Sequence, residues 1–177
     1  LSEADLTYFV AACYTNLMSI EETIMLTKAI ASNGDILKLN KYPIIDKHSI
    51  GGIPGNRTTM VLVPIITAAG LTIPKTSSRS ITSPAGTADT MEVLAKVAFP
   101  IKKMKRIIQK TNGCIVWGGS LNLAPADDNI INVEKTLEID AESQLLASIM
   151  AKKYSVSSTH ILIDIPIGEG TKVANRK

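Results

Sequence analysis

Cysteine is scarce in this sequence, which has only Cys13 and Cys114 among its 177 residues. The two lie far apart, and neither has a histidine or a second cysteine nearby at the spacing of metal ligands. A disulfide framework and a zinc site are therefore not supported. Two buried free thiols are expected instead.

Long apolar runs, aromatic side chains and a strong net charge are also missing. The longest apolar stretch, residues 60–69, has about half the length needed to cross a bilayer, and the first residues lack the basic start of a signal peptide. We therefore expect a cytoplasmic protein without membrane contact. Aromatic residues make up 4% of the chain, and its net charge of +3 is carried by scattered basic residues. A nucleic-acid surface needs a concentrated positive patch with aromatic platforms, so no nucleic-acid partner is expected, and anionic small molecules remain as candidate partners.

The composition, with 45% hydrophobic and 20% charged residues, is that of an ordinary globular protein with one sizeable core. Apolar residues recur at helical spacing over 2–15 and 19–31, and Ser19 with Glu22 has the spacing of a capping box. The pair Asn33-Gly34 then ends the second helix. This opening segment predicts a helical hairpin that serves in packing.

From Tyr42 onward, short runs rich in β-forming residues end in Gly, Ser and Thr loops, and each loop leads into a helical pattern. The predicted strands are 42–45, 71–76, 114–117 and 160–165. The predicted helices are 57–69, 87–96, 101–110, one after Pro125, and 141–153. Such alternation indicates an α/β fold with a parallel sheet flanked by helices. Ligands of such sheets bind at the carboxyl ends of the strands, where the Gly, Ser and Thr loops lie.

The segment DKHSIGGIPGNRT, residues 46–58, combines a lysine, a hydroxyl group and three glycines between a predicted strand and a predicted helix. Gly51 and Gly52 allow backbone amides to approach an oxyanion. Ser49 can donate a hydrogen bond, and Lys47 brings a compact positive charge. It is not a Walker loop, because no Gly-Lys-Ser/Thr follows the glycines. The segment predicts a phosphate cradle; a connecting turn that happens to be rich in glycine is the alternative.

A second segment, TSSRSITSPAGT over residues 76–87, packs seven hydroxyl side chains into twelve residues before a predicted helix. Hydroxyl groups and first-turn amides suit phosphate or ribose oxygens. The alternative is that one Ser or Thr caps the helix while the others are solvated. Arg79 could fork to a phosphate or form a surface ion pair.

Other candidates have two interpretations each. His48 lies in the first loop and could act on a ligand or hydrogen-bond the backbone. Asp140 precedes the helix 141–153, where an N-cap is expected. Ser148 and Lys152 are spaced i and i+4, so they share one helix face, which could contact a ligand or solvent. Trp117 is expected to be a packed aromatic near a strand end.

Four motifs together resemble the family of thymidine phosphorylase, pyrimidine nucleoside phosphorylase and AMP phosphorylase, over essentially the whole chain. They are DKHSIGG (46–52), KTSSRSITSPAGTADTMEVL (75–94), NLAPAD (122–127) and ASIMAKK (147–153). The resemblance implies a small all-α helical domain, 1–35 plus 137–156, and an α/β phosphate-binding domain, 40–136 plus 157–177. Family members are longer at both ends. We therefore expect a central fragment whose α/β domain is incomplete at its C-terminal side.

By position, the resemblance implies a phosphate-binding set of Lys47, Ser49, Ser77 and Thr87. Ser148 and Lys152 match positions that contact the base in the pyrimidine enzymes. Those enzymes also carry an Arg a few residues after NLAPAD, within Leu-Arg-Asp, whereas residues 132–135 here read Asn-Val-Glu-Lys. This departure argues against pyrimidine recognition.

The stretches HSIGGIPGNRT, SSRSITSPAGTADT, NGCIVWGG and IDIPIGEGTKV instead look like the AMP phosphorylase branch, which uses nucleoside 5′-monophosphates. That resemblance implies Asp140 as the proton donor rather than only a helix cap. The nucleotide contacts that it implies are Gly52, Ser78, Arg79, Ser80, Ile81, Thr82, Ser83, Thr87, Ser148 and Lys172.

The expected activity is phosphorolysis of nucleoside monophosphates, AMP first and CMP or UMP next, to a free base and ribose 1,5-bisphosphate. Inorganic phosphate is the co-substrate, and no cofactor or metal is expected. Thymidine phosphorolysis is the nearest rival. A phosphoribosyltransferase of similar fold would normally need a metal, for which no acidic site stands out. These 177 residues could also be a phosphate- or nucleotide-binding module with little or no turnover. The resemblance further implies a homo-oligomer, at least a dimer, of the full-length protein.

Overall fold

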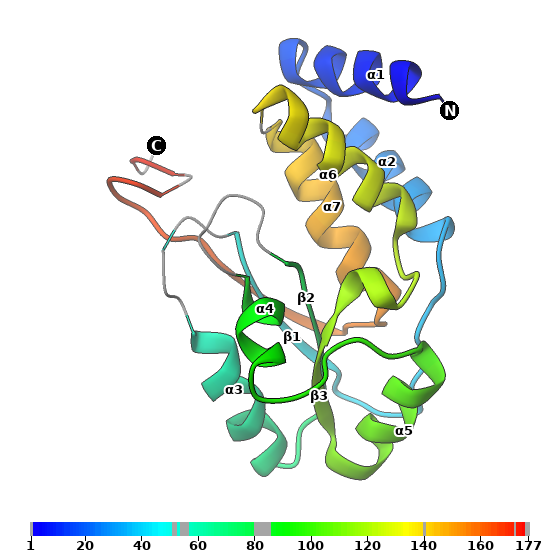
Figure 1. Cartoon of the computed structure of the whole chain (residues 1–177), viewed down its shortest axis with the longest axis vertical. Helices are drawn as coiled ribbons and strands as arrows, with labels where there is room; N and C mark the ends of the chain where they lie inside the picture. Colours follow the sequence, from blue (N-terminus) through cyan, green and yellow to red (C-terminus); the bar gives the residue numbers. More distant parts are fainter. Residues whose placement is uncertain are drawn as a thin grey trace. The chain divides into compact units, whose positions relative to one another are not determined.

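The computed structural model describes residues 2–50, 53, 57–79, 86–139, 141–171 and 173–175. It is a mixed α/β structure of helices and short parallel strands (Figure 1). The chain divides into two compact units, Leu1–Ile36 with Asn122–Val156, and Leu37–Leu121 with Ser157–Lys177. The domain boundaries drawn from the resemblance stay a prediction, because a compact unit is not by itself an independently folding domain. No helix within the described ranges is both long enough and apolar enough to span a membrane.

The first unit consists of helices. They are α1 (Glu3–Thr15), α2 (Ile20–Ser32), α6 (Pro125–Leu137) and α7 (Glu142–Ser155). The predicted capping box at the start of α2 is confirmed, because the Glu22 amide donates to Ser19 Oγ at 3.1 Å and the Ser19 amide donates to Glu22 Oε2 at 2.8 Å. These bonds satisfy two amides that the helix itself leaves without acceptors.

The core of this unit is built from small and branched apolar side chains contributed by its four helices and the segment before α6. Its buried members are Val10, Ile30, Ala31, Ala124, Ile130, Val133, Ala147 and Ala151. Gly34 follows α2 where the backbone of Leu123 passes close by, and a Cβ there would lie 2.5 Å from the Leu123 carbonyl oxygen. Small residues thus let the segments of this unit approach one another closely.

The second unit holds the strands β1 (Ile45–Ser49), β2 (Ile73–Ser77), β3 (Gly113–Trp117) and β4 (His160–Asp164). Its helices are α3 (Thr58–Ala68), α4 (Thr87–Glu92) and α5 (Ile101–Thr111), with the 3₁₀ turn η1 (Gly118–Ser120) after β3. Met104 and Ile108 of α5 are completely buried, as are Ile73 of β2 and Val116 of β3. Helices therefore cover the strands, as an α/β fold requires.

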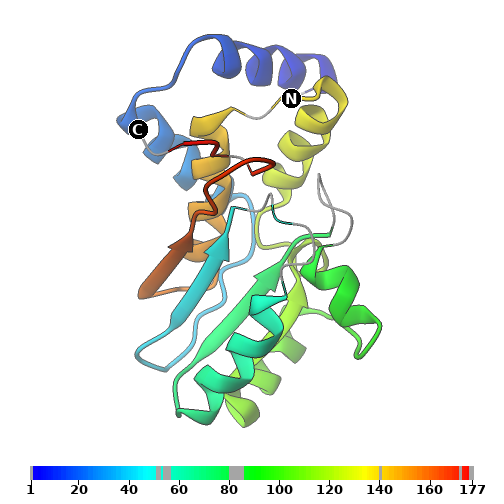
Figure 2. The same cartoon turned by 90° about the vertical axis from the view of Figure 1, so that its left-hand side faces the viewer.

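All strand pairs among the described residues are parallel. β1 pairs with β4 from Ile45 opposite His160 to Ser49 opposite Asp164, and β2 pairs with β3. A parallel bridge between Ile44 and Thr72 joins the two pairs, so the strands run in the order β4, β1, β2, β3 (Figure 2). The predicted α/β class with a parallel sheet is confirmed.

Two elements differ from the sequence prediction by more than two residues at a boundary. The first strand covers Ile45–Ser49 rather than 42–45, because Pro43 has no amide to donate and the ladder continues through Asp46 and Lys47, which are buried. Helix α4 ends at Glu92 rather than near residue 96. Val93 and Leu94, whose apolar side chains extended the predicted helix, are exposed to 85% and 70% and find no packing surface.

Candidate functional site

The carboxyl ends of the four described strands gather at one end of the parallel array. The strands finish at Ser49, Ser77, Trp117 and Asp164. In open α/β sheets this end binds ligands, because loops and helix N-termini present free backbone amides there. Residues that the sequence predicted to bind phosphate thus reach this end from β1 and β2.

Lys47 is a buried cation within β1. Its side chain is 6% exposed, and its Nζ lies 2.7 Å from Asp164 Oδ2, an ion pair in which the Asp164 side chain is 35% exposed. Asp164 stands opposite Ser49 in the register, so the ammonium group is held toward the carboxyl end of the strands. Sequence reasoning missed Asp164, although it lies near the end of a predicted strand and within the motif IDIPIGEGTKV.

His48 and Ser49 are strand residues, and their prediction as loop residues is wrong. Both are half-buried and take part in polar interactions. After Ser49 the Ile50 amide still donates to the Asp164 carbonyl oxygen at 3.1 Å. The backbone is therefore fixed by β4 up to Ile50, and the ligand roles of His48 and Ser49 stay predictions.

At the end of β2, Ser77 Oγ donates to the Ser78 carbonyl oxygen at 3.2 Å. Ser77 stands opposite Trp117 in the register of β2 and β3. The guanidinium carbon of Arg79 lies 4.6 Å from the centre of the Trp117 ring, within the range of a cation–π contact. Trp117, predicted only as a packed aromatic, thus also supports Arg79.

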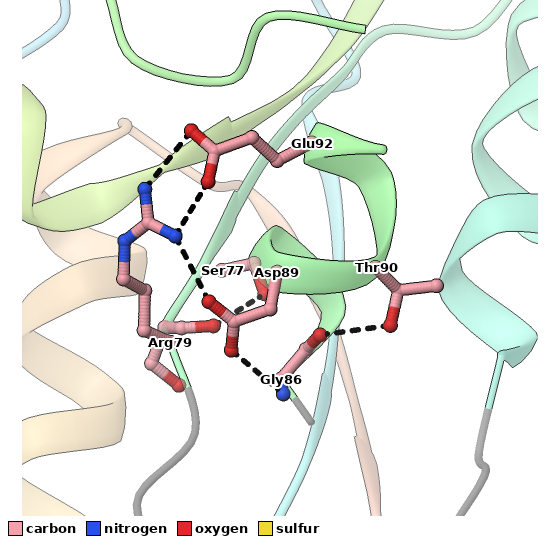
Figure 3. Close-up of polar contacts among 7 residues, drawn as sticks. Ser77, Arg79, Gly86, Asp89, Thr90 and Glu92 are labelled. Atoms are coloured by element: carbon pink, nitrogen blue, oxygen red, sulfur yellow. Dashed lines mark hydrogen bonds and ion pairs between the residues drawn. The ribbon is translucent and has the colours of Figure 1, made fainter. Parts of the chain in front are cut away.

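Arg79 is held by two carboxylates of α4 (Figure 3). Its Nη1 donates to Glu92 at 2.7 Å and to Asp89 at 2.9 Å, and its Nη2 donates to the other Glu92 oxygen at 3.0 Å. The hydrogen bonds that Arg79 donates to Glu92 and Asp89 raise the pKa of Arg79, and the bond from Arg79 lowers the pKa of Glu92. Of the two sequence interpretations, the ion pair is the one that the structure contains, and a phosphate role would use the remaining N–H groups.

The start of α4 is fixed by Asp89. While Oδ1 of this carboxylate accepts from Arg79, Oδ2 accepts from the Gly86 amide at 3.0 Å. The Thr90 hydroxyl donates to the Gly86 carbonyl oxygen at 3.1 Å. Thr87, a predicted phosphate ligand, is the half-buried first residue of this helix. One carboxylate thus ties the helix start to the arginine that follows β2.

Several predicted site residues lie outside the described part of the chain, and their roles stay predictions. They are Gly52, Ser80, Ile81, Thr82, Ser83, Asp140 and Lys172.

The two remaining candidates belong to the first unit and come together on α7. Lys152 Nζ donates to Ser148 Oγ at 3.2 Å and lies 2.6 Å from Oδ2 of Asp127 in α6. Asp127 is completely buried, whereas the Lys152 side chain is 23% exposed. Burial also raises the pKa of the neighbouring Asp128. The positive charge of Lys152 opposes this rise, and the negative charge of Asp127 adds to it. Asp127 was missed as a site residue, although it ends the motif NLAPAD.

Within the described ranges, no group of three or more His, Cys, Asp and Glu side chains is arranged to hold a metal ion. Besides the carboxylate of Asp164, which is paired with Lys47, the polar side chains at the strand ends are hydroxyl groups, a lysine and an arginine. Such side chains, together with helix-start amides, suit an anionic ligand.

The fold and these side chains define a class of protein, a mixed α/β protein whose parallel strands end in groups suited to an anion. Comparison with family models narrows the class. Residues 41–157 match the model of the glycosyl transferase family, a/b domain. The chain belongs to this family.

Curated relatives resemble almost the whole chain. An AMP phosphorylase of Pyrococcus furiosus is 55% identical over 173 residues, which are 98% of this chain and 34% of that protein. A putative thymidine phosphorylase 2 of Acidovorax sp. (strain JS42) is 53% identical over 172 residues, 97% of this chain and 34% of that protein. The chain thus spans about a third of the length of these relatives.

The fold also occurs in solved structures of low sequence identity. Anthranilate phosphoribosyltransferase from Saccharomyces cerevisiae, in complex with PRPP and Mg, superimposes with a TM-score of 0.72 at 17% identity. The match covers 92% of this chain and 46% of that chain. At this identity the likeness establishes the fold alone.

Proposed function

We propose that the protein from which this chain comes catalyses phosphorolysis of nucleoside 5′-monophosphates, with AMP as the first substrate and CMP and UMP as candidates. The products are the free base and ribose 1,5-bisphosphate. The family and the AMP phosphorylases among its relatives support the proposal. The observation that carries it is the Lys47 ammonium group, buried near the carboxyl end of β1 and held there by Asp164.

In the proposed reaction an oxygen of inorganic phosphate forms a bond to C1′ of the ribose while the bond from C1′ to the base nitrogen breaks. The bonding electrons leave with the base, which takes a proton. Two anions, inorganic phosphate and the 5′-phosphate, must lie near one sugar, so positive charge is needed to offset their repulsion. Lys47 and Arg79 are described cations that can contribute, and Lys172 is a predicted third. Asp140 is the proposed proton donor.

Thymidine phosphorolysis is the second candidate, favoured by the relatives named putative thymidine phosphorylase. The absence of the pyrimidine enzymes' Arg from residues 132–135, which lie in α6, argues against it.

A direct assay distinguishes the two candidates. The full-length protein is incubated with phosphate and separately with AMP, CMP, UMP and thymidine, and the released base is measured by chromatography. Release from AMP without release from thymidine supports the proposal, and consumption of thymidine alone overturns it. The isolated 177 residues should release little or no base, because a fragment of about a third of the protein lacks much of the fold around the site. Robust turnover by them would contradict this expectation and the alternative of a binding module without catalysis.

The homo-oligomer is likewise a proposal. An open groove of about 550 Å³ between α1 and α2 is lined mainly by apolar side chains, including Phe9, Leu17 and Met25. A second subunit covering such a surface would remove it from water. Sedimentation of the full-length protein as a monomer at micromolar concentration would contradict the proposal.

A further inference from the structure

A buried carboxylate in the first unit holds one of the candidate base-binding side chains. Asp127 lies in the first turn of α6, and Lys152 lies in the last turn of α7. The 2.6 Å contact from Asp127 Oδ2 to Lys152 Nζ joins the two helices. Ser148, one turn earlier on α7, accepts a hydrogen bond from the same ammonium group at 3.2 Å.

The contact with Lys152 matters for the stability of Asp127 because the carboxylate is buried. The side chain has no exposure to water, and an ionised carboxylate is buried only when a cation or hydrogen bonds compensate it. Among the described residues, neither oxygen accepts a hydrogen bond of good angular geometry, and the ion pair with Lys152 is the contact that remains. Asp127 therefore depends on Lys152 for compensation, while Lys152 keeps access to solvent on its other side.

The geometry determines which donors face a ligand. A lysine ammonium group has three protons, of which one is donated to Ser148, while the charged nitrogen lies 2.6 Å from Asp127 Oδ2. At least one proton remains for a ligand, and because Ser148 Oγ accepts from Lys152, its own hydroxyl proton is free to donate. Two donors, one N–H and one O–H, are thus presented from adjacent turns of α7.

We propose that Asp127 is a positioning residue, which holds the Lys152 ammonium group against Ser148 so that the pair donates to acceptor atoms of the departing base. This inference rests on the proposed function and adds a residue that the resemblance did not supply. Without the carboxylate, the long lysine side chain would sample several rotamers, and the two donors would no longer be preorganised for the base.

A double-mutant cycle in the full-length protein tests the proposal, with Asp127→Asn, Lys152→Met and the combination. Asp127→Asn should lower kcat/KM for the nucleotide by about 10-fold or more, while the KM for inorganic phosphate stays within about twofold. In the Lys152→Met background, the same substitution should change kcat/KM by less than about twofold, because the group that it positions is gone. The control is Glu142→Gln, an exposed acid at the start of α7, which should leave both constants unchanged.

Separate outcomes identify which idea fails. If the unmodified protein releases no base from any nucleotide or nucleoside, the proposed function is wrong. If it is active and Asp127→Asn reduces kcat/KM equally in both backgrounds, Asp127 does not act through Lys152 and the inference alone is overturned. Should Asp127→Asn fail to fold, Lys152→Met is compared with the double variant, in which no unpaired charge is buried. Equal kcat/KM values support positioning, and a further 10-fold loss in the double variant refutes it.

Discussion

Replacing Lys47 by Met tests whether its buried ammonium group serves phosphate or only the pairing of β1 with β4. A hydrogen bond to a charged group contributes about 1.5–3 kcal/mol, which corresponds to roughly 10- to 150-fold in an equilibrium constant. Lys47→Met should therefore raise the KM for inorganic phosphate by roughly 10- to 150-fold. The KM for the nucleoside monophosphate should change far less, because Lys47 belongs to the inorganic phosphate set of the proposed site.

Asp164→Asn is the matched control, because it removes the partner and keeps the cation. The Lys47 side chain is 6% exposed, so loss of the carboxylate leaves a largely buried charge. Breaking a fully buried pair costs about 3–5 kcal/mol, but Asp164 is 35% exposed and Asn still offers an oxygen to Lys47. We therefore expect a loss of about 1–2 kcal/mol in the free energy of unfolding. The KM for phosphate should stay within about twofold, since burial of the Lys47 side chain in β1 still limits its direction and a negative charge near the anion is removed.

The assay is phosphorolysis by the full-length protein with phosphate varied at saturating nucleotide, together with urea unfolding of each variant. The two substitutions should differ in the KM for phosphate and resemble each other in stability. If both variants lose similar stability and leave the KM for phosphate within about twofold, Lys47 is a structural partner of Asp164. The phosphate site must then be sought elsewhere.

Two further predictions concern the buried side chain of Gln144 and the partly buried thiol of Cys114. Gln144 is 1% exposed, and neither its amide nitrogen nor its oxygen has a hydrogen-bond partner among the described residues, so Gln144→Met should stabilise the protein by about 1 kcal/mol in urea unfolding. Unchanged or lower stability would mean that the amide has a partner in the full-length protein. Burial raises the pKa of Cys114 to about 12 from 9.0, so iodoacetamide at pH 8 should alkylate the native thiol roughly 1000-fold more slowly than the urea-unfolded one. The thiol's stabilising contribution should be complete below about pH 9 and be lost as pH rises toward 12; equal alkylation rates in both states would refute the reasoning.

Local sequence signals predicted most of the fold. The capping box at Ser19 and Glu22 and the alternation of strands with helices depend on residues close together in the chain. The first strand was predicted at the wrong residues because its position depends on residues that are distant in the chain. Asp46 and Lys47 look like loop residues by hydropathy, yet they are buried in β1, where Asp46 accepts a hydrogen bond from Ser158 and Lys47 forms an ion pair with Asp164. Such compensation cannot be seen in a local window.

The residue types of the candidate site could be predicted from the sequence, whereas the ion-pair partners of these residues could not. Lys47 was predicted as a phosphate ligand from its neighbours, but its pairing with Asp164 depends on the register of β1 and β4. Arg79 left two interpretations open, and only the placement of α4 brings Glu92 to its guanidinium group. The pair of Asp127 and Lys152 likewise requires α6 and α7 to pack together.

These three pairs have one chemical consequence in common. Each described candidate cation, Lys47, Arg79 and Lys152, already contacts a carboxylate of its own unit. Each cation keeps N–H groups that can still donate to a ligand, because a lysine has three donor protons and an arginine five. Lys47 has two protons beyond the one that Asp164 receives, and Arg79 keeps its Nε proton and one on Nη2. A carboxylate thus fixes the direction of each cation before an anion arrives and lowers the local positive charge. An arrangement of this kind favours anions that match the remaining donors in geometry over those attracted by charge alone.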